Sequence, residues 1–196
     1  MPKETFNNLS EDKKQKIFNA AVREFSTKRF SEASINQIVK AAGIPRGSFY
    51  QYFKDKEDIF LYVFNAILKE KQEVLRNAED VNPDADVFEV LMQTTRASYK
   101  WSKAKPEYSQ ISMLMEIDNS EFITRLRTSA AKVLREMVER DKQRGLIKPE
   151  IDPDLVVEMI YTFYIKEYFW IGLDEEVFLK RIKDVLKMIK EGIANV

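Results

Sequence analysis

The stretch SINQIVKAAGIPRGSFYQYFKDK, residues 34–56, has the pattern of two short helices joined by a tight turn and followed by the start of a third helix. Ser34 and Gln37 have the spacing of a capping box, which predicts that a helix begins at Ser34. Gly43 can adopt the left-handed conformation that ends a helix, and Pro45 suits the first turn of the next one. Two helices joined in this way are typical of a helix-turn-helix that binds DNA.

The second helix of this stretch indicates which side chains face DNA. Phe49 and Phe53 are four residues apart, so both are expected to lie in the core and to turn the polar residues between them outward. Arg46 and Gln51 are expected to read base edges, because Arg pairs with guanine and Gln with adenine. The others are expected to hold phosphates or, for glycine, to let the helix approach the groove. The full predicted set is Ser34, Arg46, Gly47, Ser48, Tyr50, Gln51, Tyr52 and Lys56.

The same residues resemble the signature of the TetR family of bacterial transcriptional repressors. The resemblance rests on the spacing S-I-x-x-I-V-x-x-A-G-I-P-R-G-S-F-Y-Q-Y-F-K-D-K and on the amphipathic segment 10–25 upstream of it. It implies a cytoplasmic repressor that binds an inverted-repeat operator as a homodimer and is released by a small molecule. The chain departs from the family pattern at four positions. The family usually has Gly, Thr, Ala and Ser, respectively, where this chain has Arg29, Ala33, Val39 and Pro45.

The composition excludes several classes of enzyme. The chain has 196 residues and contains neither Cys nor His. Ser-His-Asp and Cys-His catalysis and disulfides are therefore impossible, and the commonest transition-metal ligand is missing. No pair of carboxylates stands out from the ordinary charge pattern, so we expect no enzyme, no metal and no cofactor. The first residues have no apolar stretch typical of a secretory signal, which predicts a cytoplasmic protein.

The charges are balanced overall but not evenly distributed. The chain has 32 basic and 32 acidic residues, whereas residues 1–60 contain eleven basic and eight acidic ones. An excess of this size is also found on ordinary solvated surfaces. It favours DNA binding only because several basic residues lie in or near the predicted helix-turn-helix. These residues are Lys13, Lys14, Arg46, Lys54 and Lys56.

The rest of the chain predicts an all-α fold of about nine helices. A periodic apolar pattern runs through residues 55–78 and predicts one long helix. Further helices are expected at 85–103, 107–117, 119–144, 152–172 and 174–193. We expect a helix-turn-helix DNA-binding domain at 1–54 and a ligand-binding and dimerisation domain at 55–196. The helix 55–78 would be the only covalent link between them.

The last two predicted helices are candidates for a dimer interface. Residues 155–173 are apolar nearly all round, which requires burial on more than one side, while three charges argue against a membrane span. The final helix carries an apolar stripe at alternating four- and three-residue steps. The alternative is that this stripe packs inside the monomer. The residues predicted to form the interface are Phe163, Trp170, Phe178, Ile182, Val185 and Ile189.

Large apolar side chains between these regions predict a pocket for a bulky, hydrophobic small molecule. Each Met or aromatic residue alone is more often a packing residue, but their number allows a site between helices. The candidates are Phe64, Met92, Tyr99, Trp101, Tyr108, Met113, Phe122, Tyr164 and Tyr168. An alternative function is an all-helical carrier of hydrophobic ligands that does not bind DNA, although this alternative leaves the outward polar face near residues 46–52 unexplained.

Overall fold

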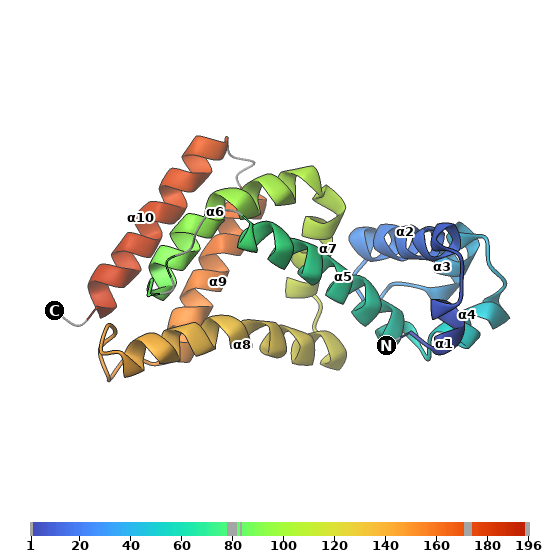
Figure 1. The fold of residues 1–196 in the computed structure, drawn as a ribbon, viewed down its shortest axis with the longest axis horizontal. Coiled ribbons are helices and arrows are strands. Elements are labelled where there is room, and N and C mark those ends of the chain that lie inside the picture. Colours follow the sequence, from blue (N-terminus) through green and yellow to red (C-terminus); the bar gives the residue numbers. More distant parts are fainter. Residues whose placement is uncertain (1, 78–81, 83, 171–173, 195–196) are drawn as a thin grey trace. The chain divides into compact units, whose positions relative to one another are not determined.

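The computed structural model describes residues 2–77, 82, 84–170 and 174–194, without the side chains of residues 130 and 165–170. These residues form ten helices (Figure 1), which confirms the all-α prediction. The helices are α1 (Glu4–Asn7), α2 (Glu11–Thr27), α3 (Ile35–Ala42), α4 (Arg46–Tyr52), α5 (Lys56–Arg76), α6 (Val87–Ala104), α7 (Pro106–Glu116), α8 (Glu121–Gln143), α9 (Pro153–Trp170) and α10 (Glu175–Ile193).

The short helix α1 is the element that the sequence did not predict. It spans one turn, Glu4–Asn7, and therefore shows no apolar periodicity that could reveal it. Its side chain Phe6 is buried, with 2% of its surface exposed. Such a short helix is not stable by itself, so it must be held by the elements on which it packs.

The chain forms two compact units. Unit 1 contains Met1–Gln72 and Ala104–Leu126, and unit 2 contains Glu73–Lys103 and Arg127–Val196. The chain passes between these units three times, so α5 is not their only covalent connection. None of the described helices combines the length and the apolar character that a membrane span requires.

The core of unit 1 holds the helix-turn-helix together. Phe49 and Phe53 are fully buried, as predicted, among the other buried side chains of α2, α3 and α5. Gly43 has a φ of 66° and ends α3, and the N–H of Ile44 donates to the carbonyl of Val39 at 3.0 Å. The turn between α3 and α4 therefore forms where the sequence predicts it, and only a residue that tolerates positive φ fits at position 43.

The capping box predicted at Ser34 is not formed. α3 does begin after Ser34, but the Ser34 side chain makes no capping hydrogen bond. Its backbone N–H, which Gln37 would accept in a capping box, donates instead to Oε1 of Glu24 at 2.9 Å. A carboxylate is the stronger acceptor of the two, and it is delivered by α2 rather than by the adjacent turn.

The core of unit 2 contains the apolar stripe of α10, which corrects the predicted dimer contacts. Phe178, Ile182 and Ile189 are buried within the chain, against residues of α6 and α9. Val185 and Phe163 pack on the same core, while the Trp170 side chain lies outside the described residues. Phe178, Ile182 and Ile189 therefore already have partners in their own chain, which favours the alternative that the stripe packs inside the monomer.

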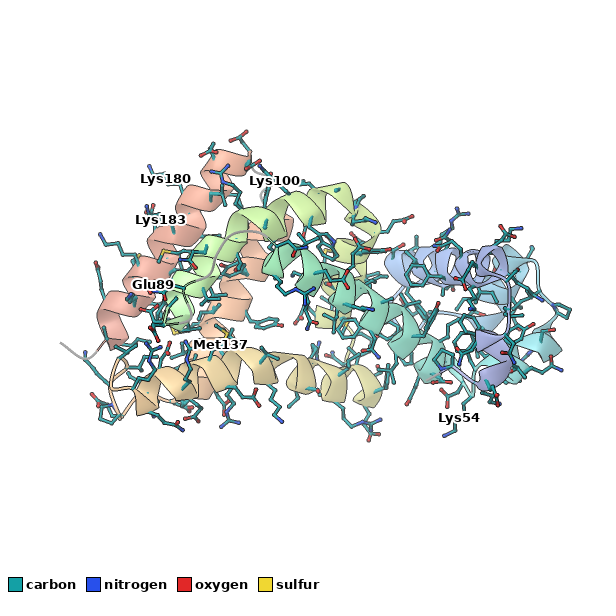
Figure 2. The ribbon with its side chains drawn as sticks, viewed as in Figure 1. Lys54, Glu89, Lys100, Met137, Lys180 and Lys183 are labelled. Atoms are coloured by element: carbon teal, nitrogen blue, oxygen red, sulfur yellow. The ribbon has the colours of Figure 1, made fainter. Side chains whose placement is uncertain are left out.

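The opposite side of α10 is exposed and basic. Lys180 and Lys183 point away from the rest of unit 2 (Figure 2), and both are exposed. A helix with one apolar and one charged side buries the apolar side against its neighbours. This orientation leaves a different set of α9 and α10 residues available for contact with another molecule.

Candidate nucleic-acid interface

The helix α4 has an exposed polar side and a buried phenylalanine that anchors it. Phe49 is fully buried, whereas Arg46, Tyr50 and Gln51 are exposed, Tyr50 by 42% of its surface. Ser48 is half-buried. The structure thus places four of the residues predicted to read and hold DNA, Arg46, Ser48, Tyr50 and Gln51, on one helix with its polar side exposed.

Gly47 lies on the exposed side of α4 as well. A Cβ atom added at Gly47 would meet no protein atom within 4 Å. Packing inside the chain therefore does not explain this glycine. A position where a second molecule approaches the backbone closely is the usual alternative reason for glycine in a helix.

Tyr52 was predicted to hold a phosphate, but its side chain is buried. Only 6% of its surface is exposed, and its ring lies 6.1 Å from that of Phe6 and 5.7 Å from the ammonium of Lys13. Tyr52 follows Phe49 by three residues, so both side chains share one face of the helix. The unpredicted α1 covers that face and encloses the tyrosine.

Lys56 also differs from the expectation, because its ammonium turns inward. It donates hydrogen bonds to the carbonyls of Ala33 at 2.9 Å and Ser31 at 3.3 Å, and it lies 4.7 Å above the ring of Phe30. Burial lowers the pKa of Lys56, while the nearby carboxylates of Asp118 and Glu24 act in the opposite direction. Lys56 therefore holds the loop before α3, and local spacing could not reveal partners so far away in the sequence.

Lys54 is the exposed cation at the end of α4. It lies between α4 and α5 and points away from the surrounding ribbon (Figure 2). Ser34 is half-buried at the start of α3. Lys14, in contrast, forms an ion pair with Glu11 at 2.8 Å. Among the basic residues singled out in the sequence, Arg46 and Lys54 are thus the two exposed ones beside the polar surface of α4.

A buried carboxylate joins the loop before α3 to the segment between α7 and α8, both within unit 1. Asp118 is 1% exposed and accepts hydrogen bonds from the backbone N–H groups of Ser31 at 2.7 Å and Ser120 at 2.8 Å. Burial alone would raise the pKa of Asp118, but the hydrogen bonds from Ser120 and Ser31 outweigh it and lower the pKa to about 2. The charged form of this side chain is therefore part of the folded structure.

Lowering the pH should destabilise the folded protein by protonating the carboxylate of Asp118. Because its folded pKa lies below the unfolded value of 3.8, its contribution to stability is full above about pH 4 and is lost as pH falls toward about 2. The free energy at stake is about 2 kcal/mol. In Asp118→Asn we expect that loss already at neutral pH and a flatter acid titration, measured by urea denaturation with circular dichroism. Asp12→Asn, at an exposed ion pair with Lys16, should leave both unchanged.

The predicted ligand residues are divided between the two units. Phe64, Tyr108, Met113 and Phe122 belong to unit 1, and the Phe122 ring lies 4.6 Å from that of Phe30 in its core. Met92, Tyr99, Trp101 and Tyr164 belong to unit 2, where Tyr99 packs 4.9 Å from the ring of Phe178. The Tyr168 side chain is outside the described residues. Several of these residues therefore serve as core, as aromatic residues in helical proteins usually do.

Comparisons with known proteins agree with this structure. The family described as "Bacterial regulatory proteins, tetR family" matches residues 17–63. The uncharacterised HTH-type transcriptional regulator YdgC of Bacillus subtilis is 25% identical over 185 residues, which cover 93% of this chain and 89% of YdgC. The curated relatives are transcriptional regulators, in agreement with the expectation that the chain is not an enzyme.

Two solved structures share the fold along most of the chain. A TetR family transcriptional regulator from Chloroflexus aurantiacus matches with a TM-score of 0.73 and 24% identity, covering 100% of both chains. The regulator FadR from Bacillus subtilis, in complex with stearoyl-CoA, matches with a TM-score of 0.66 and 21% identity, covering 88% of this chain and 97% of FadR.

Proposed function

Because the chain belongs to the TetR family of transcriptional regulators, we propose that two copies of it bind an inverted-repeat operator through α4 and that a bulky hydrophobic molecule releases them. The main observation behind this proposal is that Arg46, Tyr50 and Gln51 are exposed on a helix whose Phe49 side chain is buried. The expectation of repression as the outcome of binding comes from the resemblance of residues 34–56 to the TetR family of repressors.

The proposed contacts with DNA are of two kinds, those with base edges and those with phosphates. Arg46 and Gln51 would read base edges in the major groove, since their side chains can form paired hydrogen bonds with guanine and adenine. Tyr50, Ser48 and Lys54 would hold phosphates and fix the register of the helix. Lys54 replaces Lys56 as the proposed phosphate contact, because Lys54 is exposed whereas the ammonium of Lys56 is bound inside unit 1.

A dimer is proposed because an inverted repeat requires two copies of α4 about 34–36 Å apart. The exposed apolar side chains of α9 and α10 are the candidates for the interface. Leu155 and Met159 of α9 are 55% and 48% exposed, and Met188 of α10 is 72% exposed. Leu155 and Met159 lie one helical turn apart and so share a face. Exposed apolar patches of this kind mark contact sites between proteins.

A hydrophobic effector is proposed from the fold and from the interior of unit 2. The fold is shared with FadR, whose structure contains stearoyl-CoA. In unit 2 the hydroxyl groups of Thr95 and Tyr164 lie 2.6 Å apart within an apolar core. Burial raises the pKa of Tyr164 to about 12, although the hydrogen bond with Thr95 acts in the opposite direction. Because the Thr95 hydroxyl donates to the carbonyl of Leu91 at 2.5 Å, the Tyr164 hydroxyl donates to Thr95, and its oxygen can accept a hydrogen bond from one polar atom of a largely apolar ligand.

The proposed release requires that the effector distinguish two states. A ligand shifts the spacing of the two α4 helices only if it has different affinities for the DNA-bound and the released arrangement. The long helix α5, which begins directly after the helix-turn-helix, is the proposed carrier of this change. A ligand that binds both arrangements equally would leave DNA affinity unchanged.

The proposal is tested by selecting DNA from a random pool with the whole protein. Enrichment of an inverted repeat supports it, whereas equal recovery of inverted-repeat and scrambled DNA favours the carrier alternative. The selected complex is then exposed to stearoyl-CoA as the first probe of the effector class. Release of DNA supports an effector with an acyl chain, whereas retention of DNA excludes stearoyl-CoA as the effector.

Replacing Arg46 with Ala should weaken binding to the selected operator by about 1–3 kcal/mol and relax the preference at one base pair of each half-site. The loss follows from the paired hydrogen bonds that a guanine would no longer receive. Fluorescence anisotropy with the operator and with single-base variants measures both effects. Lys69→Ala removes an equal charge from an exposed position of α5, and it should leave the base preference unchanged.

A further inference from the structure

The carbonyl groups in the last turn of α4 lack hydrogen-bond donors within the helix itself. The last carbonyls of any helix lack intrahelical donors. In α4 the carbonyl of Phe49 accepts the N–H of Phe53 at 2.8 Å, which leaves the carbonyls of Tyr50, Gln51 and Tyr52 beyond the reach of the helical pattern. The last turn of α4 contains no basic residue that could offset the negative end of the helix.

Residues far away in the sequence supply the missing donors. The backbone N–H of Lys3 donates to the carbonyl of Tyr52 at 2.8 Å, and the ammonium of Lys3 donates to the carbonyl of Tyr50, also at 2.8 Å. The hydroxyl of Thr5 donates to the carbonyl of Gln51. Three donors from residues 3–5 thus serve the three terminal carbonyls of α4.

An aromatic anchor holds these donors in place. Phe6 is 2% exposed, and its ring lies 5.0 Å from that of Phe53 and 5.1 Å from that of Tyr62. Its N–H donates to the carbonyl of Lys3 at 2.9 Å, which fixes the turn that carries Lys3. Burial of the ring therefore determines where the two donor side chains lie, and Figure 1 shows α1 beside α4.

We propose that residues 3–6, the amino-terminal clamp, position the last turn of α4 for reading DNA. The inference deepens the proposed function and rests on it. Tyr50 and Gln51, whose carbonyls the clamp holds, are also residues of the DNA-facing surface. A helix of seven residues is not stable alone, and its last turn frays most readily. Lys3 and Thr5 are therefore positioning residues, which set the direction of side chains that they do not touch.

The clamp also has an electrostatic role at the same place. Unpaired carbonyls at the end of a helix carry partial negative charge, which repels phosphates. The ammonium of Lys3 lies 2.8 Å from one of these carbonyls and supplies the positive charge that α4 lacks. DNA would then approach a neutralised helix end instead of a negative one.

The clamp is tested with Lys3→Met combined with Thr5→Val, which removes both side-chain donors and keeps their approximate size. Affinity is measured for the selected operator and for random DNA of equal length, with thermal unfolding as a parallel measurement. We expect operator affinity to fall about tenfold or more, as for a lost base contact. Affinity for random DNA should fall at most about twofold, since one charge is lost.

Controls separate positioning from charge and from stability. Lys69→Met loses the same charge on α5 and should lower the two affinities equally. Lys3→Arg combined with Thr5→Ser retains donors at both positions and should restore the ratio of operator to random affinity. Thr5→Val alone keeps all charges and should lower this ratio partly.

Two results would overturn the clamp. One is an unchanged ratio of affinities in the Lys3→Met, Thr5→Val protein, whether both affinities fall together or neither does. The other is a ratio that the donor-retaining variant fails to restore. A failure of the proposed function is distinguishable, because the unaltered protein would then enrich no inverted repeat at all.

Discussion

Replacing Phe49 with Ala is expected to lower the free energy of unfolding of unit 1 by about 3–5 kcal/mol and to abolish operator binding. The Phe49 ring is fully buried and lies 5.6 Å from that of Phe53 and 5.2 Å from that of Tyr50. Its removal leaves a cavity under the face by which α4 packs on the core of unit 1. The loss is a large part of the stability of a typical domain. Urea denaturation followed by circular dichroism measures it.

The adjacent residue provides the matched control for this prediction. Tyr50 lies on the same helix but is 42% exposed, so Tyr50→Ala should lower the free energy of unfolding by only about 0.5–1.5 kcal/mol, through the loss of its ring contact with Phe49. Operator affinity should nevertheless fall in this variant, because Tyr50 is a proposed phosphate contact. Unfolding of Phe49→Ala at the same urea concentration as the unaltered protein would contradict the role of Phe49 as the anchor.

The helix-turn-helix could be predicted because its determinants are local. Phe49 and Phe53 follow helical spacing, and Gly43 has a positive φ that a turn of this kind requires. Such features depend on residues within one or two turns of each other. They were sufficient to locate α3 and α4 and to identify the exposed position of Arg46.

The errors at the same site involve partners that are distant in the sequence. Tyr52 is enclosed by Phe6, and Lys56 is bound by carbonyls of the loop before α3. Neither partner has a fixed spacing from the residue it contacts. The amphipathic pattern of a short helix indicates which side is apolar, but a second short element can cover a side that the pattern leaves open.

The stripe of α10 shows a different limit of sequence reasoning. Its spacing correctly indicated a buried face, but a periodic pattern does not say whether the partner belongs to the same chain or to another one. Ile182 and Phe178 are buried by α6 and α9, so this stripe is satisfied within the monomer. The proposed dimer surface consequently lies on residues of α9 and α10 that the stripe does not include.

Replacing both Leu155 and Met159 with Glu is expected to convert the proposed dimer to monomers and to reduce operator affinity by about a hundredfold or more. Burying an unpaired carboxylate costs several kcal/mol, and each copy would bring two of them to the interface. A monomer also loses the high effective concentration with which the second copy of α4 meets its half-site. Sedimentation velocity measures the assembly, and fluorescence anisotropy measures the affinity.

The fold itself should tolerate these two substitutions, because both side chains are about half exposed in the chain. Circular dichroism and thermal unfolding of the variant are therefore expected to match those of a monomer with intact helices. Val133→Glu provides the control, since Val133 is 63% exposed on α8 and lies outside the proposed interface. It should leave the dimer intact. If dimers persist after both substitutions in α9, the contact between the two copies lies on another surface. The proposed interface on α9 would then be wrong.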